Sequence, residues 1–109
     1  RKRWVEEFKE FKEANILLLF GSVLRKDKDY NDVDLVMVVD EKKFLALRKK
    51  VQEKNEMLFK KVHPVWQSPG DLVKNLKKPD PVILGALRTG VVLKGHGELV
   101  EVVCSVASR

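Results

Sequence analysis

Residues 17–40, LLLFGSVLRKDKDYNDVDLVMVVD, decide the fold of this chain. They begin within an apolar run over residues 16–20 and end with a second run over residues 33–39, and both runs are typical of strands. The second run is too apolar to be half exposed, so we expect a central strand that is covered on both sides. The rest of the chain is expected to pack around these two strands.

The remaining segments predict an α/β domain. A chain of 109 residues is large enough for one core, so we expect a single domain over residues 1–109, with a small mixed β-sheet and helices packed on it. The expected elements are a helix over residues 1–14, a helix over 41–56, a strand over 57–67 that Pro64 weakens or bends, a helix over 68–76, a helix over 80–87 and a strand over 91–93. Residues 98–107 fit a strand or a terminal helix.

The N-terminal segment has Trp4, Val5, Phe8 and Phe11 at helical spacing among lysines and glutamates. This pattern predicts an amphipathic helix. Its aromatic stripe, which includes Phe8 and Phe11, is expected to lie in the core or in a subunit contact rather than to bind a ligand.

Two acidic residues, Asp32 and Asp34, interrupt the start of the second apolar run. Alternate side chains of a strand point to the same face, so these two carboxylates project together. They repel each other unless a cation lies between them, and Mg²⁺ prefers such oxygen ligands. The pair therefore predicts a metal site, although a solvated strand edge is the simpler alternative.

Gly21 and Ser22 directly follow the first strand and open what the sequence predicts to be a helical turn. Glycine allows the backbone to approach a ligand closely, and free N–H groups at a helix start favour phosphate. The serine hydroxyl is one more donor. A phosphate-binding turn and a metal-binding acid pair on neighbouring strands predict a site for a nucleoside triphosphate, whereas the alternative is an ordinary surface turn.

The combination of these motifs resembles a known family. Gly21-Ser22, a nine-residue spacer and Asp32-Val33-Asp34-Leu35-Val36 are similar to the hG[GS]…Dh[DE]h signature of the DNA polymerase β-like nucleotidyltransferases. The small size resembles the minimal nucleotidyltransferases of archaea and bacteria, which also end in a helix followed by a GxxLxG-like strand, here residues 90–95. The specific part of the resemblance covers about a fifth of the chain.

The resemblance implies a polymerase β-like nucleotidyltransferase fold and a metal-dependent transfer reaction. In the family, two Mg²⁺ ions are held by the acid pair and by a third carboxylate on a later strand, and a nucleoside monophosphate passes from a triphosphate to an acceptor hydroxyl. Carried over, Asp32 and Asp34 are the catalytic metal ligands, and Gly21 and Ser22 bind the phosphates of a nucleotide, expected to be ATP. Arg25 is a further candidate phosphate contact, with simple solvent exposure as the alternative.

The third carboxylate is where this sequence departs from the family. The predicted strand over residues 57–67 contains no acid, and His63 holds the corresponding place. Histidine binds transition metals but is a poor ligand for Mg²⁺, so a structural role for His63 is the alternative. The nearest acid in sequence is Glu56, and Asp71 is already explained as a helix-capping residue.

Two functions of different classes therefore stay open. The first is a nucleotidyltransferase that moves an AMP-like group onto a protein or small-molecule acceptor. The resemblance implies a helical HEPN protein as a partner, in a toxin–antitoxin arrangement. The second is a degenerate domain that binds nucleotide, metal or a partner without turnover.

Charge and cysteine content narrow the cellular setting. The single cysteine, Cys104, cannot form an internal disulfide, which fits a reducing cytoplasm. Neither a membrane span nor a signal peptide is visible. A net charge of +6 is compatible with nucleic acid, but the basic runs lack interleaved aromatics, so we favour a lysine-rich solvated surface. The oligomeric state stays open, a dimer included.

Overall fold

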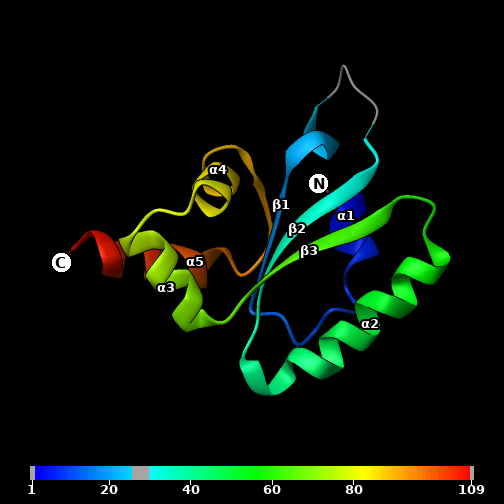
Figure 1. Ribbon diagram of the computed structural model, residues 1–109, viewed down its shortest axis with the longest axis horizontal. Helices are drawn as coiled ribbons and strands as arrows, with labels where there is room; N and C mark the ends of the chain where they lie inside the picture. Colours follow the sequence, from blue (N-terminus) through cyan, green and yellow to red (C-terminus); the bar gives the residue numbers. More distant parts are fainter. Residues whose placement is uncertain (1, 26–29, 109) are drawn as a thin grey trace.

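The computed structural model describes residues 2–25 and 30–108 (Figure 1). Within these residues the chain forms a four-stranded mixed sheet with five α-helices. The α-helices are α1 (Lys2–Glu7), α2 (Phe44–Met57), α3 (Pro69–Lys77), α4 (Pro81–Thr89) and α5 (His96–Ala107), and the strands are β1 (Ile16–Phe20), β2 (Asp32–Val38), β3 (Lys61–Gln67) and β4 (Val91–Lys94). Two 3₁₀ turns, η1 (Gly21–Leu24) and η2 (Glu41–Lys43), complete the order. The α/β class expected from the sequence is confirmed.

The strand order across the sheet is β3-β2-β1-β4. The two strands predicted first from the sequence, β1 and β2, are the two inner strands. They pair antiparallel, β4 also pairs antiparallel with β1, and β3 pairs parallel with β2. A parallel connection needs a crossover, and α2 supplies it between β2 and β3. Pro64 is tolerated in β3 because β3 is an edge strand.

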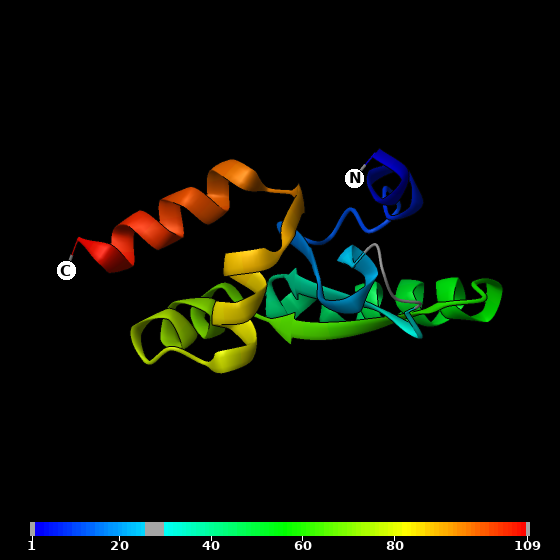
Figure 2. The ribbon, with the colours of Figure 1, turned by 90° about the horizontal axis from the view of Figure 1, so that it is seen from above.

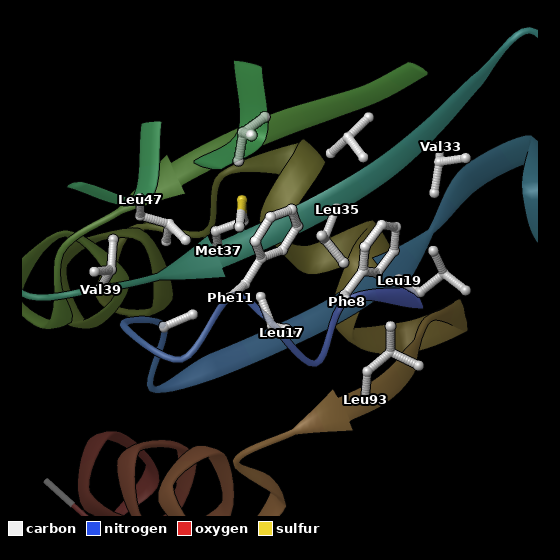
Figure 3. Close-up of a cluster of buried hydrophobic side chains, with 13 residues drawn as sticks. Phe8, Phe11, Leu17, Leu19, Val33, Leu35, Met37, Val39, Leu47 and Leu93 are labelled. Atoms are coloured by element: carbon white, nitrogen blue, oxygen red, sulfur yellow. The ribbon is translucent and has the colours of Figure 1, made fainter. Parts of the chain in front are cut away.

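One face of the sheet, which we call the α2 face, is covered by α1, the segment after it and α2. Residues that alternate along β1 and β2 point to this face, among them Leu19, Leu35 and Met37. Phe8 and Phe11 lie over them, and each ring is 1% exposed (Figure 3). Of the two alternatives that the sequence left open for the aromatic stripe, core or subunit contact, the structure places Phe8 and Phe11 in the core.

The opposite face, which we call the α4 face, is covered by α3, α4 and α5. Ile16, Leu18, Val36 and Val38 of the sheet pack there against the helices. Figure 1 shows these three helices grouped to the left of the sheet, with α1 and α2 to the right. Because Asp32 and Asp34 alternate with Val33 and Leu35, the acid pair belongs to the α4 face.

The predicted N-terminal helix over residues 1–14 is wrong in length, because α1 ends at Glu7. After it the backbone forms i→i−3 hydrogen bonds, from Phe11 N to Phe8 O at 3.0 Å and from Ala14 N to Phe11 O at 3.3 Å. These tighter turns place both rings on the sheet, where they stack on each other with centroids 5.4 Å apart. Burial of two aromatic rings outweighs the local preference for a longer helix.

The start of β3 is also later than the predicted strand over residues 57–67. Met57 belongs to α2, and the strand begins at Lys61, opposite Asp32. Phe59 lies in the connection and is 96% exposed, so the apolar run at 57–59 is not a buried segment. The helix expected over residues 41–56 begins with η2, where Asp40 accepts a hydrogen bond from Lys42 N at 3.1 Å. It continues as α2 through Met57.

The C-terminal half follows the sequence closely. Ser68 and Asp71 form a reciprocal capping box at the start of α3, as the Ser-Pro-Gly-Asp pattern predicts. Asp80 caps α4 through Val82 N and Ile83 N. The segment over residues 98–107, which the sequence left undecided, is part of helix α5. Of the helices in the described ranges, none has the length and hydrophobicity that a membrane span requires.

Candidate functional site

The candidate site lies on the α4 face, at the end of the sheet where β1 ends and β2 begins. The register places Phe20 of β1 opposite Asp34 of β2, and Asp34 in turn opposite His63 of β3. These three side chains therefore form one row across three strands on the same face. The turn that follows Phe20 starts at Gly21, next to this row.

Gly21 lies against one member of the acid pair, Asp34. Its φ of +82° lies in the left-handed region, which favours glycine. A Cβ at this position would collide with Oδ2 of Asp34, and Cγ of Asp34 would lie only 3.3 Å from it. The sequence therefore needs glycine here for two reasons, and the predicted phosphate-binding turn and Asp34 lie in one site.

Ser22 and Arg25 line the outer side of this turn. Together with Gly21, Leu24 and Thr89 they enclose a depression of about 430 Å³. The predicted helical turn is a single 3₁₀ turn. It is too short for its backbone dipole to contribute much to anion binding. Any anion bound here would depend on backbone N–H groups, the Ser22 hydroxyl and the exposed Arg25.

A second depression adjoins the first on the side of α4. It has a volume of about 620 Å³, and Phe20 and Gly21 form one wall. The facing wall belongs to α4 and includes Gly85, Arg88 and Thr89. The lining of this depression is largely apolar apart from Arg88 and Thr89. Its volume would admit a flat organic group beside the turn at Gly21.

His63, which the sequence placed where the family has its third carboxylate, lies beside Asp34. Nδ1 of His63 is 3.1 Å from Oδ1 of Asp34. The carboxylate of Asp34 is 26% exposed and the imidazole is 68% exposed, so both are accessible from solvent. Asp32 is opposite Lys61 at the outer end of the same strands and is exposed.

Within the described residues, no third acid joins the pair. Among residues 2–25 and 30–108, no group of three or more His, Cys, Asp or Glu side chains could hold a metal ion. Glu56 is on α2, which covers the other face of the sheet. Asp71 follows the far end of β3, and hydrogen bonds from the backbone N–H and hydroxyl of Ser68 lower the pKa of its carboxyl. Among the described residues, Asp32 and Asp34 are therefore the only two of the three carboxylates that the family resemblance calls for.

The structure adds Thr89 to the site, which sequence reasoning missed. Thr89 ends α4 and lines both depressions. Antiparallel pairing of Leu19 with Val91 brings this helix end beside Gly21. The sequence signal is indirect, because it requires the pairing of β4 with β1 to be known. Residues 26–29 of the spacer lie outside the described residues. They include Lys26, expected with Arg25 near the phosphates, and residues 27–29, expected to form a loop.

Comparisons with family models, with curated proteins and with solved structures give no match for this chain. The family resemblance therefore depends on the motifs and their placement alone. The residues that carry it, Gly21, Ser22, Asp32 and Asp34, lie at one edge of the sheet, with Gly21 against Asp34.

Proposed function

We propose that this protein is a metal-dependent nucleotidyltransferase of the polymerase β-like type. It would transfer a nucleoside monophosphate, AMP-like in our expectation, from a nucleoside triphosphate to a protein or small-molecule acceptor. The observation that supports this most is the close contact between Gly21 and Asp34. A turn suited to phosphate and a carboxylate suited to a metal ion serve one ligand only when they are adjacent, and a Mg²⁺–triphosphate complex requires both.

Each residue of the site has a distinct role in this proposal. The backbone at Gly21, the Ser22 hydroxyl and Arg25 bind the triphosphate, and the depression between Gly21 and α4 accepts the nucleoside. Asp32 and Asp34 hold the metal ion. When bound, Mg²⁺ neutralises phosphate charge and lowers the pKa of an attacking hydroxyl.

The proposed reaction is a substitution at the α-phosphorus. A bond forms between the acceptor oxygen and the α-phosphorus, and the bond from the α-phosphorus to the bridging oxygen of the β-phosphate breaks. Pyrophosphate leaves with that bonding pair, and the proton of the acceptor hydroxyl passes to solvent. We expect the acceptor to be presented by a partner, for which a HEPN-type protein is our expectation.

One observation favours a second function, a domain that binds nucleotide without turnover. His63 occupies the register position opposite Asp34 where the family resemblance calls for a third carboxylate. Without that carboxylate the second ion of the family mechanism lacks a ligand. Nucleotide binding and transfer therefore have to be measured separately.

The experiment is a calorimetric titration of ATP into the protein, with and without Mg²⁺. We expect binding that depends on Mg²⁺ and that falls by about tenfold or more in Asp32→Asn and in Asp34→Asn. Glu56→Gln is the matched control, because it removes an exposed acid from the opposite side of the sheet. All three variants should keep the unfolding free energy of the wild type to within about 0.5 kcal/mol.

The outcomes separate the two functions. Release of pyrophosphate from ATP in the presence of an acceptor or partner would support transfer. Metal-dependent binding without pyrophosphate release would support the domain that binds only. Equal affinity of wild type and Asp34→Asn for Mg²⁺–ATP would contradict both.

A further inference from the structure

Gly85 lies in the middle of α4, at a position where the fold itself gives no reason for glycine. Glycine is less favourable in a helix interior than any residue except proline. The φ of Gly85 is not positive, so its backbone conformation does not require glycine. Beyond the helix's own backbone, no atom of the described chain lies within 4 Å of the place that a Cβ would take. The space beside Gly85 is therefore open, whereas at Gly21 the same space is filled by Asp34.

This open space belongs to the depression of about 620 Å³ between the end of β1 and α4. Its lining is largely apolar and combines the aromatic ring of Phe20 with the small residues Gly85 and Ala86. An aromatic ring and a stretch of helix without long side chains are suited to contact the two faces of a planar ring system. Gly21 is part of the same lining, so a planar group bound here lies next to the turn proposed to bind phosphate.

The polar side chains of this lining, Arg88 and Thr89, are poorly suited to read the edge of one particular base. The Thr89 hydroxyl donates a hydrogen bond to Gly85 O at 2.8 Å, so its hydrogen is already used. Arg88 is exposed and carries donors only. Discrimination between bases by their edges takes a fixed, matched set of donors and acceptors. Contact with the faces of the base therefore dominates, and because this contact grows with buried ring area it favours purines over pyrimidines.

We propose that this depression is a stacking slot for a purine base, in which the base lies on α4 at Gly85 and faces Phe20. The inference rests on the proposed nucleotidyltransferase function and narrows its substrate class to purine nucleoside triphosphates, with ATP and GTP bound alike. The absence of a side chain at position 85 keeps the surface of the helix free for the base. If the slot took no base, alanine at this position would stabilise the helix without any loss of binding.

The test is a calorimetric titration of the whole protein with the Mg²⁺ complexes of ATP, GTP, CTP, UTP and inorganic tripolyphosphate. We expect ATP and GTP to bind within about threefold of each other and at least about fivefold more tightly than the other three. Gly85→Leu should weaken ATP and GTP binding by about tenfold or more and change tripolyphosphate binding by less than about twofold, because the leucine side chain fills the slot and leaves the turn free. Gly85→Ala should show a smaller loss in the same direction and a higher midpoint of urea unfolding.

Gly97→Leu is the matched control. Gly97 is also a helical glycine with open space at its Cβ position, but it lies on α5 and does not line the depression. This variant should bind all five ligands as the wild type does. Gly85→Ala introduces no clash within the described chain and carries the same test if Gly85→Leu does not fold.

The results distinguish this inference from the proposed function. Equal affinity of wild type and the Gly85 variants for ATP overturns the stacking slot, and so does a preference of more than about tenfold between ATP and GTP, which requires readout of the base edge. In both cases Mg²⁺-dependent triphosphate binding persists and the proposed function stands. Failure of all five ligands to bind the wild type would overturn the proposed function and the stacking slot with it.

Discussion

The two faces of the sheet differ in how completely they are covered. On the α2 face, the aromatic residues Phe8 and Phe11 fill the space between the N-terminal segment and the strands. On the α4 face, the buried core does not reach the end of the sheet where β1 ends and β2 begins. The row formed by Phe20, Asp34 and His63 lies at that end. The candidate site is on the face that is less covered, and the metal and phosphate binding proposed for it would require polar groups open to solvent.

Ion pairs at the edge of the α2 face join the N-terminal segment to α2. Lys54 of α2 lies 2.6 Å from Glu10 and 3.3 Å from Glu7, and its side chain is largely buried. Burial alone would lower the pKa of Lys54, but its hydrogen bonds with Glu10 and Glu7 outweigh this and leave the pKa raised. The N-terminal segment is thus joined to α2 by charges as well as by aromatic packing.

Helix α5, on the α4 face, is packed less closely against the rest of the described chain. In Figure 2 it extends away from the rest of the chain toward the C-terminus. Leu99 is its only buried residue within the described helix, although Val100, Val102, Val103 and Val106 are also apolar. Two of these valines, Val100 and Val103, line an open apolar groove of about 510 Å³ together with leucines of α3 and α4.

The largest effect is expected on the α2 face. Phe11→Ala should lower the free energy of unfolding by about 3–5 kcal/mol, because the ring is fully buried and its removal leaves a cavity. Urea denaturation followed by circular dichroism measures this difference. A loss below about 1 kcal/mol would mean that the N-terminal segment does not pack on the sheet in solution, and would remove the contrast between the faces.

A smaller effect is expected at the start of α3, on the α4 face. Asp71→Asn should cost about 0.3–1 kcal/mol at neutral pH, because the carboxylate accepts a hydrogen bond from Ser68 N and lies in the first turn of the helix. The pKa of Asp71 is lowered in the folded state from its usual value of 3.8. The stabilisation is therefore complete above that usual value and is lost as the pH falls through the lowered pKa.

Unfolding measurements of wild type and Asp71→Asn from pH 7 to pH 3 provide the check. The difference in unfolding free energy should be constant near neutral pH and shrink in the acid range. A difference that is independent of pH throughout would show that the variant acts through its amide geometry and not through the lost charge.

The sequence predicted the parts of this fold that depend on local patterns. Apolar runs bounded by turn residues marked β1 and β2, and capping residues marked the starts of α3 and α4. The N-terminal segment was misjudged because Phe8 and Phe11, three residues apart, fit a continuous helix and a series of tight turns equally well. Only the stacking of the rings on the sheet decides between them, and that is a tertiary contact.

For the candidate site, too, the sequence predicted only what depends on local patterns. The sequence placed Gly21-Ser22 and the acid pair on neighbouring strands and His63 on the next strand, but the register that sets Asp34 opposite Phe20 and His63 is known only from the structure. Thr89 could not be found, because its place depends on β4 returning to the outer side of β1. Long-range pairings of this kind leave little trace in local sequence.

The smallest effect is expected on α5, and it tests whether the α4 face is as open as it looks. Val103 is 40% exposed in the apolar groove, so Val103→Ser should change the free energy of unfolding by no more than about 0.5 kcal/mol. Valine and serine have similar helix propensities, so α5 itself should be unaffected. Urea denaturation at two protein concentrations measures the change. A loss above about 1 kcal/mol that grows with protein concentration would show that this surface is covered in solution by a second copy of the chain, and the contrast between the two faces would then hold only for the monomer.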